Sequence, residues 1–219
     1  MTLKILVFLG SVRTSSPPAP ARLGLRVAKR CVQQLAQNNH DVILIDPLDY
    51  DLSDPFMPLF SYPAGQAPED LQQLAQQIKS ADAYVMVSPE YNHSMSPALA
   101  NLLNHFGSSL FSYKPSVIVT YSAGQWGGVR AAVNMRSFLS ELGCLPVSAM
   151  IHLPRAQEVL TDEGVYAEGV SAADWSRYCE RAFSQLEWWA TAANKHRDND
   201  EGKQRPFAFI RNPSQRNAP

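Results

Sequence analysis

The chain has 219 residues, of which 45% are hydrophobic, so we expect one domain with a sizeable core. Its formal net charge of −1 argues against nucleic acid or an anionic membrane as the main partner, because both need a basic face. The three cysteines have no CxxC spacing, and no apolar run approaches the ~20 residues of a membrane span. With an N-terminal run too short for a signal peptide, these features predict a reduced, cytoplasmic protein.

Short apolar runs predict buried strands, and apolar residues three and four positions apart predict helices. In chain order we expect a strand at 3–9, a helix at 21–38, a strand at 42–45, a helix from 68, a strand at 82–87, a helix at 97–106, a strand at 116–121, a helix at 128–142 and a strand at 146–151. Such alternation predicts a parallel sheet with helices on both faces.

The end of the chain divides into two parts. A helix is expected over 171–195, with Ser171 as its N-cap and Asp174 three residues later as a partial capping box. We expect residues 1–197 to form the domain and residues 198–219 to be a polar tail. Two interpretations of this tail stay open: disorder, or an arm that packs on a partner subunit.

Three loops follow predicted strand ends, which is where open α/β sheets bind ligands. The first loop carries Gly-Ser-Val-Arg at 10–13, the second Pro-Glu-Tyr-Asn at 89–92, and the third Tyr-Ser-Ala-Gly-Gln-Trp-Gly-Gly at 121–128. We expect these loops to meet over one flat ligand that bears a phosphate.

The first loop favours a terminal phosphate over a dinucleotide. It lacks the second and third glycines of a GxGxxG fingerprint, and no Walker A lysine follows. It offers the hydroxyls of Ser11, Ser15 and Ser16 and the guanidinium of Arg13, all of which donate hydrogen bonds to phosphate oxygens. The same residues also occur as ordinary helix caps and a solvated arginine.

Taken together, the three motifs resemble the NAD(P)H-dependent FMN reductase family, in order from residue 3 to about residue 151. The resemblance implies a flavodoxin-like, doubly wound, five-stranded parallel sheet of order 2-1-3-4-5 in three layers. It also implies bound FMN, transient NADPH or NADH, and a homodimer or homotetramer whose interface borders the flavin.

The same resemblance gives the motif residues roles. Ser11 and Arg13, with a hydroxyl from Ser15 or Ser16, form the FMN phosphate site. The ring is lined by the second loop, through Pro89, Glu90, Tyr91 and Asn92. A second wall comes from the third loop, through Ser122, Gly124, Trp126 and Gly127. Because a Pro-rich stretch lengthens the first loop, Ser15, Ser16 and Arg22 all stay open as the residue that completes the phosphate site.

The implied activity passes a hydride from NAD(P)H to N5 of FMN, and then to a quinone, azo compound, metal oxyanion or flavin acceptor. No acid or base side chain is obligatory, so we name no catalytic residue, and no metal site is expected. A flavodoxin-type electron carrier and a non-catalytic FMN-binding regulator remain alternatives. A hydrolase is disfavoured, because the nearest GxSxG string begins with Thr120.

Overall fold

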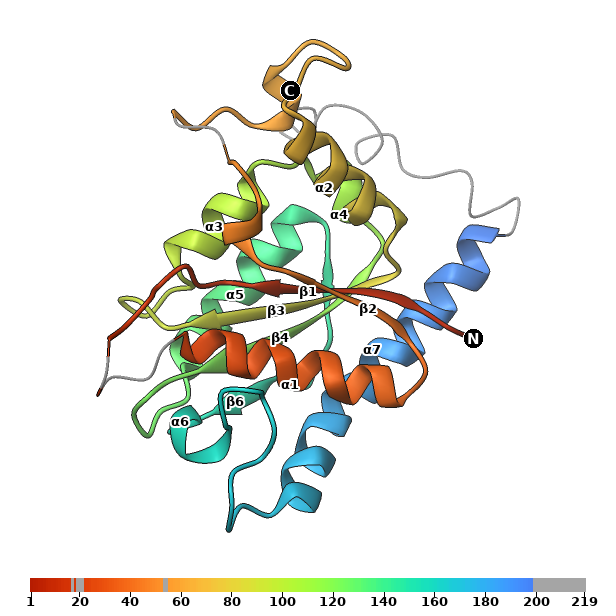
Figure 1. Ribbon diagram of the computed structural model, residues 1–219. Helices are drawn as coiled ribbons and strands as arrows, with labels where there is room; N and C mark the ends of the chain where they lie inside the picture. The colour runs from red at the N-terminus through yellow and green to blue at the C-terminus, as the bar shows by residue number, and fades with distance from the viewer. Residues whose placement is uncertain (17, 19–21, 53–54, 199–219) are drawn as a thin grey trace.

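The computed structural model describes residues 1–16, 18, 22–52 and 55–198 (Figure 1). Its parallel sheet has the order β2-β1-β3-β4-β5, with β6 also paired to β4. The strands are β1 (Lys4–Leu9), β2 (Asp41–Ile45), β3 (Ala83–Pro89), β4 (Pro115–Tyr121), β5 (Leu145–Pro146) and β6 (Ile151–Leu153). The predicted order 2-1-3-4-5 is confirmed. Except for its first residue, Asp198, the predicted tail lies outside the described residues.

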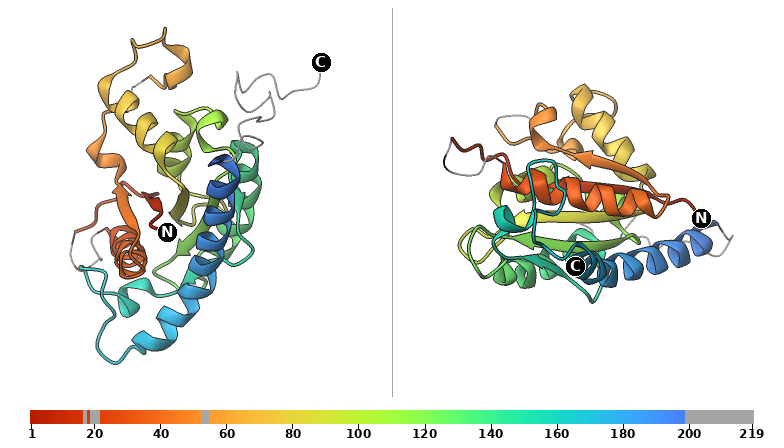
Figure 2. Two further views of the ribbon diagram at one scale, coloured as in Figure 1. Left: turned by 90° about the vertical axis from the view of Figure 1, so that its right-hand side faces the viewer. Right: turned by 60° about the horizontal axis from the view of Figure 1, so that its bottom comes forward.

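Helices cover both faces of the sheet (Figure 2). One face carries α1 (Leu23–Gln37), α6 (Ala156–Val159) and α7 (Ala172–Asp198), and the other carries α2 (Glu69–Ser80), α3 (Pro97–Asn104), α4 (Ser108–Phe111) and α5 (Val129–Leu142). Because successive strand side chains point to opposite faces, Val7 belongs to the first core and Phe8 to the second. Strands buried on both faces explain the continuous apolar runs in the sequence.

The fifth strand differs from its prediction. We expected one strand over 146–151, whereas the structure has the two short strands β5 and β6. Between them the amide of Ala149 donates to Oε1 of Gln185 on α7, at 3.0 Å. From α5, Arg136 Nη2 donates to the carbonyl of Val147, at 2.9 Å. Side chains of α5 and α7 therefore form hydrogen bonds with the backbone of Val147 and Ala149, in place of the strand-to-strand bonds of a continuous strand.

The last helix is fixed at both ends. At its start, the predicted cap is present, because Ser171 Oγ accepts from the amide of Asp174 at 3.4 Å and donates to Asp174 Oδ2 at 2.7 Å. At its end, Arg197 Nη2 lies 3.3 Å from Asp82 Oδ1, and Asp82 Oδ2 accepts from the amide of Lys4 at 2.8 Å. Since Asp82 precedes β3 and Lys4 begins β1, α7 ends at the amino ends of the strands.

The segment between β2 and α2 contains two short 3₁₀ helices, η1 (Pro47–Asp49) and η2 (Leu59–Ser61), in its described part. Within the residues that the structure describes, none of the helices combines the length and hydropathy needed to cross a bilayer.

Candidate cofactor site

The three predicted loops converge on one cleft. It has a volume of about 230 Å³ and lies at the carboxyl ends of β1, β3 and β4. Among the predicted residues, its lining includes Ser11, Arg13, Ser15, Pro89, Glu90, Tyr91 and Ser122. Arg22, which the sequence leaves open, also lines the cleft, and so do three residues that have no predicted role: Leu23, Tyr121 and Ala123. The other predicted residues belong to the same loops but not to this lining: Ser16, Asn92, Gly124, Trp126 and Gly127.

The first and second loops are tied together at their bases. The amide of Gly10 donates to the carbonyl of Val87 at 2.7 Å, and a Cβ at Gly10 would collide with that oxygen. Ser96 Oγ donates to the carbonyl of Gly10 and accepts from the amide of Leu99 at 3.1 Å, so it also caps α3. Only glycine fits where the first loop approaches the carbonyl of Val87 in β3. These contacts hold the carboxyl ends of β1 and β3 in a fixed relation.

Arg22 is already paired in this structure. Its guanidinium forms two hydrogen bonds with the buried carboxylate of Asp46, at 2.7 and 2.9 Å, and a third with the carbonyl of Ser11 at 3.2 Å. The hydrogen bonds with Asp46 raise the pKa of Arg22. In contrast, the exposed Arg13 forms no ion pair within the described part of the chain. Arg13 is thus the cleft arginine whose charge a bound anion would neutralise.

Tyr121 places a hydroxyl group at the base of the first loop. It ends β4, is only 4% exposed, and its hydroxyl lies beside the side chain of Ser11. A Cβ at Gly24, in the first turn of α1, would collide with the phenol oxygen. Burial raises the pKa of the Tyr121 phenol, so it stays protonated at neutral pH and is able to donate a hydrogen bond. The sequence alone gives Tyr121 no role in the site, because it ends a continuous apolar run and resembles a core position.

The second loop forms a two-residue reverse turn. Tyr91 and Ser94 exchange backbone hydrogen bonds, each 2.9 Å long. The residues between them, Asn92 and His93, have φ values of 49° and 63°, in the left-handed region. A turn with two positive φ angles favours asparagine, which gives Asn92 a conformational role besides the predicted one. The side chain of Asn134 donates to the carbonyl of His93 and holds this turn against α5.

Glu90 connects the second loop to the start of α5. Its Oε2 accepts from the amides of Arg130 at 3.2 Å and Ala131 at 3.4 Å, and its Oε1 lies 3.9 Å from Arg130 Nη1. A carboxylate is favourable at a helix N-terminus, because it satisfies free amides and interacts with the helix dipole. The Arg130 guanidinium lies 5.6 Å from the ring centroid of Trp126, which is 61% exposed beside the cleft.

Hydrogen bonds of the Ser122 side chain with the backbone of the third loop hold that loop in shape. Ser122 Oγ accepts from the amide of Gly127 at 2.9 Å and donates to the carbonyl of Gly124 at 2.7 Å. Gly127 has a φ of 61°, and a Cβ there would lie 3.1 Å from the Pro154 nitrogen. The amide of Arg155 donates to the carbonyl of Gly124 at 2.8 Å, so the segment after β6 supports this loop from outside.

A histidine lies beneath the third loop. His152 Nδ1 is 2.7 Å from Thr120 Oγ1, and its Cβ would lie 3.3 Å from a Cβ at Gly127. Burial lowers the pKa of His152, and the nearby charge of Arg181 lowers it further. The side chain is therefore neutral at pH 7 and forms one hydrogen bond with Thr120.

Metal and thiol chemistry are not indicated at the cleft. Across the described ranges of the chain, His, Cys, Asp and Glu side chains form no group of three that would hold a metal ion. The three cysteines are free and buried, and burial raises the pKa of Cys144 to about 12. None of them lines the cleft.

Comparison with known proteins identifies the family. Residues 3–158 match the family model for NADPH-dependent FMN reductases. The chain belongs to the NADPH-dependent FMN reductase family. An NADPH azoreductase from Bacillus sp. (strain OY1-2) is 35% identical to this family member over 92 residues, which are 42% of the chain and 52% of the azoreductase. An NAD(P)H-dependent FMN reductase from Schizosaccharomyces pombe is 26% identical over 191 residues, 85% of the chain and 90% of that protein.

The chain spans about half the length of the first curated relatives that it matches, 52% of the azoreductase and 45% of an NAD(P)H-dependent FMN reductase from Pseudomonas aeruginosa. Among solved structures, the flavoenzyme NAD(P)H:(acceptor) oxidoreductase FerB from Paracoccus denitrificans has a TM-score of 0.66 at 20% identity, covering 85% of this reductase-family chain and 98% of FerB. This likeness confirms the flavodoxin-like fold that the motifs predicted.

Proposed function

We propose that this chain is a flavoenzyme that binds FMN in the cleft and transfers electrons from NADPH or NADH to a small-molecule acceptor. The observation that carries the proposal is the convergence of three hydrogen-bonded loops on one cleft beside Arg13, which forms no ion pair with any residue that the structure describes. Family membership supports the choice of FMN as the ligand. When bound, FMN accepts a hydride from the nicotinamide and passes the electrons to the acceptor.

The phosphate end of the ligand belongs at the first loop. Arg13 supplies the positive charge there, and Ser11, Ser15 and Tyr121 supply hydroxyl donors. Arg22 does not complete this site, because Asp46 already neutralises its charge. Arg22 instead shapes the loop through its hydrogen bond with the carbonyl of Ser11.

The ring end belongs between the second and third loops. Pro89 and Tyr91 form one wall, and Ser122 with Ala123 forms the other. Glu90 acts by positioning the second loop on α5, and Ser122 Oγ by holding the third loop closed. Gly124 and Gly127 leave the backbone of the third loop without side chains, so that it approaches a flat ring closely.

The acceptor and the nicotinamide are proposed to use the same open side of the cleft in turn. Tyr91 and Trp126 are 38% and 61% exposed beside it, so their rings are available to stack against flat substrates. Quinones, azo compounds, metal oxyanions and free flavins are the acceptor classes that we propose. We also propose a homodimer or homotetramer, and a cytoplasmic location that suits three free cysteines.

An electron carrier without reductase activity is the second candidate. Such carriers are usually strongly acidic where they dock their redox partners, whereas this chain has a net charge of −1. A regulator that binds FMN without turnover is the third candidate. One experiment separates the reductase from both of these candidates.

The test is an absorption spectrum of the purified full chain before and after anaerobic addition of NADPH and, separately, NADH. We expect flavin bands that one of the nucleotides bleaches, followed by catalytic oxidation of that nucleotide when menadione is added. Flavin bands that neither nucleotide bleaches would indicate a carrier or regulator. A colourless protein that takes up no added FMN would refute the proposed function.

A further inference from the structure

The outer side of α7 carries a surface that no described element covers. Two adjacent indoles are exposed there, Trp188 by 61% and Trp189 by 48%. An open groove of about 530 Å³ runs along this side and is lined only by residues of α7. We call these residues the α7 stripe: Ser184, Glu187, Trp188, Thr191, Ala192 and Lys195.

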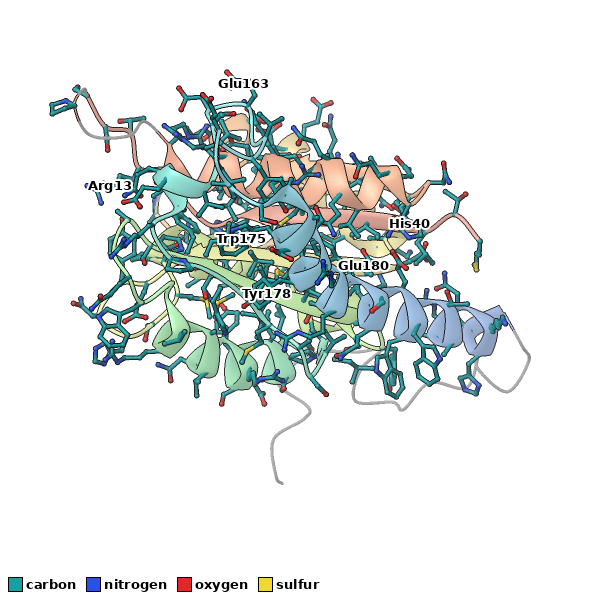
Figure 3. The ribbon with its side chains drawn as sticks, turned by 90° about the horizontal axis from the view of Figure 1, so that it is seen from below. Arg13, His40, Glu163, Trp175, Tyr178 and Glu180 are labelled. Carbon is teal, nitrogen blue, oxygen red and sulfur yellow. The ribbon has the colours of Figure 1, made fainter. Side chains whose placement is uncertain are left out.

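The α7 stripe lies away from the cofactor cleft. Two residues beyond it, Arg197 contacts Asp82 at the amino ends of the strands, whereas the cleft lies at their carboxyl ends. Figure 3 shows this separation, with Arg13 at one end of the molecule and the last turns of α7 at the other. The stripe is therefore not part of the candidate cofactor site.

Exposed paired tryptophans indicate a binding surface. The rings of Trp188 and Trp189 pack edge to face, with centroids 4.7 Å apart and an interplanar angle of 87°. Contiguous exposed apolar groups with a polar surround mark interaction sites, and tryptophan is enriched among the residues that dominate binding energy. The pair is ordered by its own contact before any partner arrives.

The charges of the stripe are arranged symmetrically. Glu187 and Lys195 lie four residues before and after Thr191, so each is displaced by about 6 Å along the helix axis from that residue. Glu187 is held in place by Asn38 Nδ2 at 2.8 Å and His40 Nε2 at 3.1 Å. Two such helices crossing antiparallel at Thr191 bring Glu187 of each copy opposite Lys195 of the other.

We infer that a second copy of this chain docks on the α7 stripe, with the two helices antiparallel about a two-fold axis at Thr191. The small side chain of Ala192 allows close approach at the crossing, and Trp188 packs along the alkyl stem of the facing Lys195. A parallel pairing is disfavoured, because it places Glu187 against Glu187 and Lys195 against Lys195. The contact is isologous, so each residue pair occurs twice.

The inference is tested by the mass of the full-length chain in analytical ultracentrifugation across a range of concentrations. We expect Trp188→Ser to raise the dissociation constant of this association about thirtyfold, and Lys195→Glu about tenfold. Glu187→Lys should act like Lys195→Glu. The double variant with both charges reversed should return close to the wild-type constant, because each opposed pair is then restored.

A matched control comes from the same helix. Arg177→Glu makes the same charge change as Lys195→Glu, at an exposed residue paired with Asp174 at 3.2 Å about two turns before the stripe. It should leave the association unchanged. High salt should weaken the wild-type association, and it should not weaken that of the Lys195→Glu variant, which has lost the attractive charge pairs.

Three results would overturn the inference. One is an association that Trp188→Ser leaves unchanged, and another is a charge-reversed double variant that stays as weak as its single variants. The third concerns a variant in which Phe207 and Phe209 are replaced with aspartate. A shift in its tryptophan fluorescence that is absent in the Trp188→Ser background, with no change in the state of association, would identify the chain's own terminal segment as the occupant. FMN binding is measured alongside. All stripe variants should retain it, so failure here is distinguishable from failure of the proposed function.

Discussion

The carboxylate of Glu90, in the loop after β3, accepts hydrogen bonds from the amides of Arg130 and Ala131 in the first turn of α5. Two segments 40 residues apart in the chain are joined there by one side chain. The contact supports the α5 dipole and holds the Pro-Glu-Tyr-Asn loop against the cleft. Glu90 is thus best described as a positioning residue of the candidate site.

Replacing Glu90 with alanine should lower the free energy of unfolding by about 1 kcal/mol, the usual effect of losing a helix cap. Glu90→Gln should cost less, because its side-chain oxygen still accepts from both amides. Urea denaturation of the wild type and both variants measures the difference. Equal losses in the two variants would show that the charge, and not the hydrogen-bond geometry, is what stabilises α5.

Replacing Arg13 with alanine should weaken FMN binding by about 1.5–3 kcal/mol, the scale of hydrogen bonds to charged groups. Riboflavin lacks the phosphate, so its affinity should not change. Titrations of the apo-protein that follow flavin fluorescence measure both affinities. Arg177→Ala serves as the control, since Arg177 is an exposed arginine of α7 far from the cleft. An unchanged FMN affinity in Arg13→Ala would remove this residue from the phosphate site.

Replacing Tyr121 with phenylalanine tests the hydroxyl group beside Ser11. The ring packing is retained, so the loss of one hydrogen bond to a charged phosphate should lower FMN affinity about tenfold or more and leave riboflavin binding unchanged. Tyr84→Phe is the matched control, because its buried hydroxyl donates to the carbonyl of Ile78 at 2.9 Å on the α2 side of the sheet. If both flavins lose affinity equally, Tyr121 supports the cleft without contacting the phosphate.

His152 predicts a pH dependence of stability. Its folded-state pKa is lower than the ordinary value of 6.5, so the unfolded chain binds its proton more readily than the folded chain. The stabilisation is therefore present above about pH 6.5 and is lost as the pH falls towards the folded-state value. In His152→Asn, the amide keeps a partner for Thr120 and does not titrate. The difference between wild-type and variant unfolding free energies should shift in favour of the variant between pH 7.5 and 5.5, measured by urea denaturation.

The sheet was predictable because its strands are buried on both faces and so form continuous apolar runs. Its strand order followed from the family resemblance, which runs from residue 3 to about residue 151, and the observed order agrees with it. The fifth strand was not predictable in detail. Its interruption depends on Arg136 and Gln185, whose side chains reach backbone groups from distant helices, and local sequence carries no signal of such contacts.

The candidate site was predictable at the level of its loops and less so at the level of its side chains. Polar motifs at three strand ends identified the cleft. The pairing of Arg22 with Asp46 was not visible, because the two residues are 24 positions apart and belong to different elements. The glycine at position 24, early in α1, reflects the close approach of the Tyr121 hydroxyl, because a Cβ there would collide with it. This reason for the glycine is visible only in the three-dimensional structure.

The broken fifth strand also affects how this protein meets other sheets. An edge strand with free amides and carbonyls is a template for strand addition and aggregation. Here that edge is only two residues long at β5, and Arg136 and Arg181 bind carbonyls between β5 and β6. These side chains of α5 and α7 thus occupy carbonyls that could otherwise pair with a strand of another molecule. Removing Arg136 should free the carbonyls of Val147 and Ser148, which would then be available for pairing with a strand of another molecule.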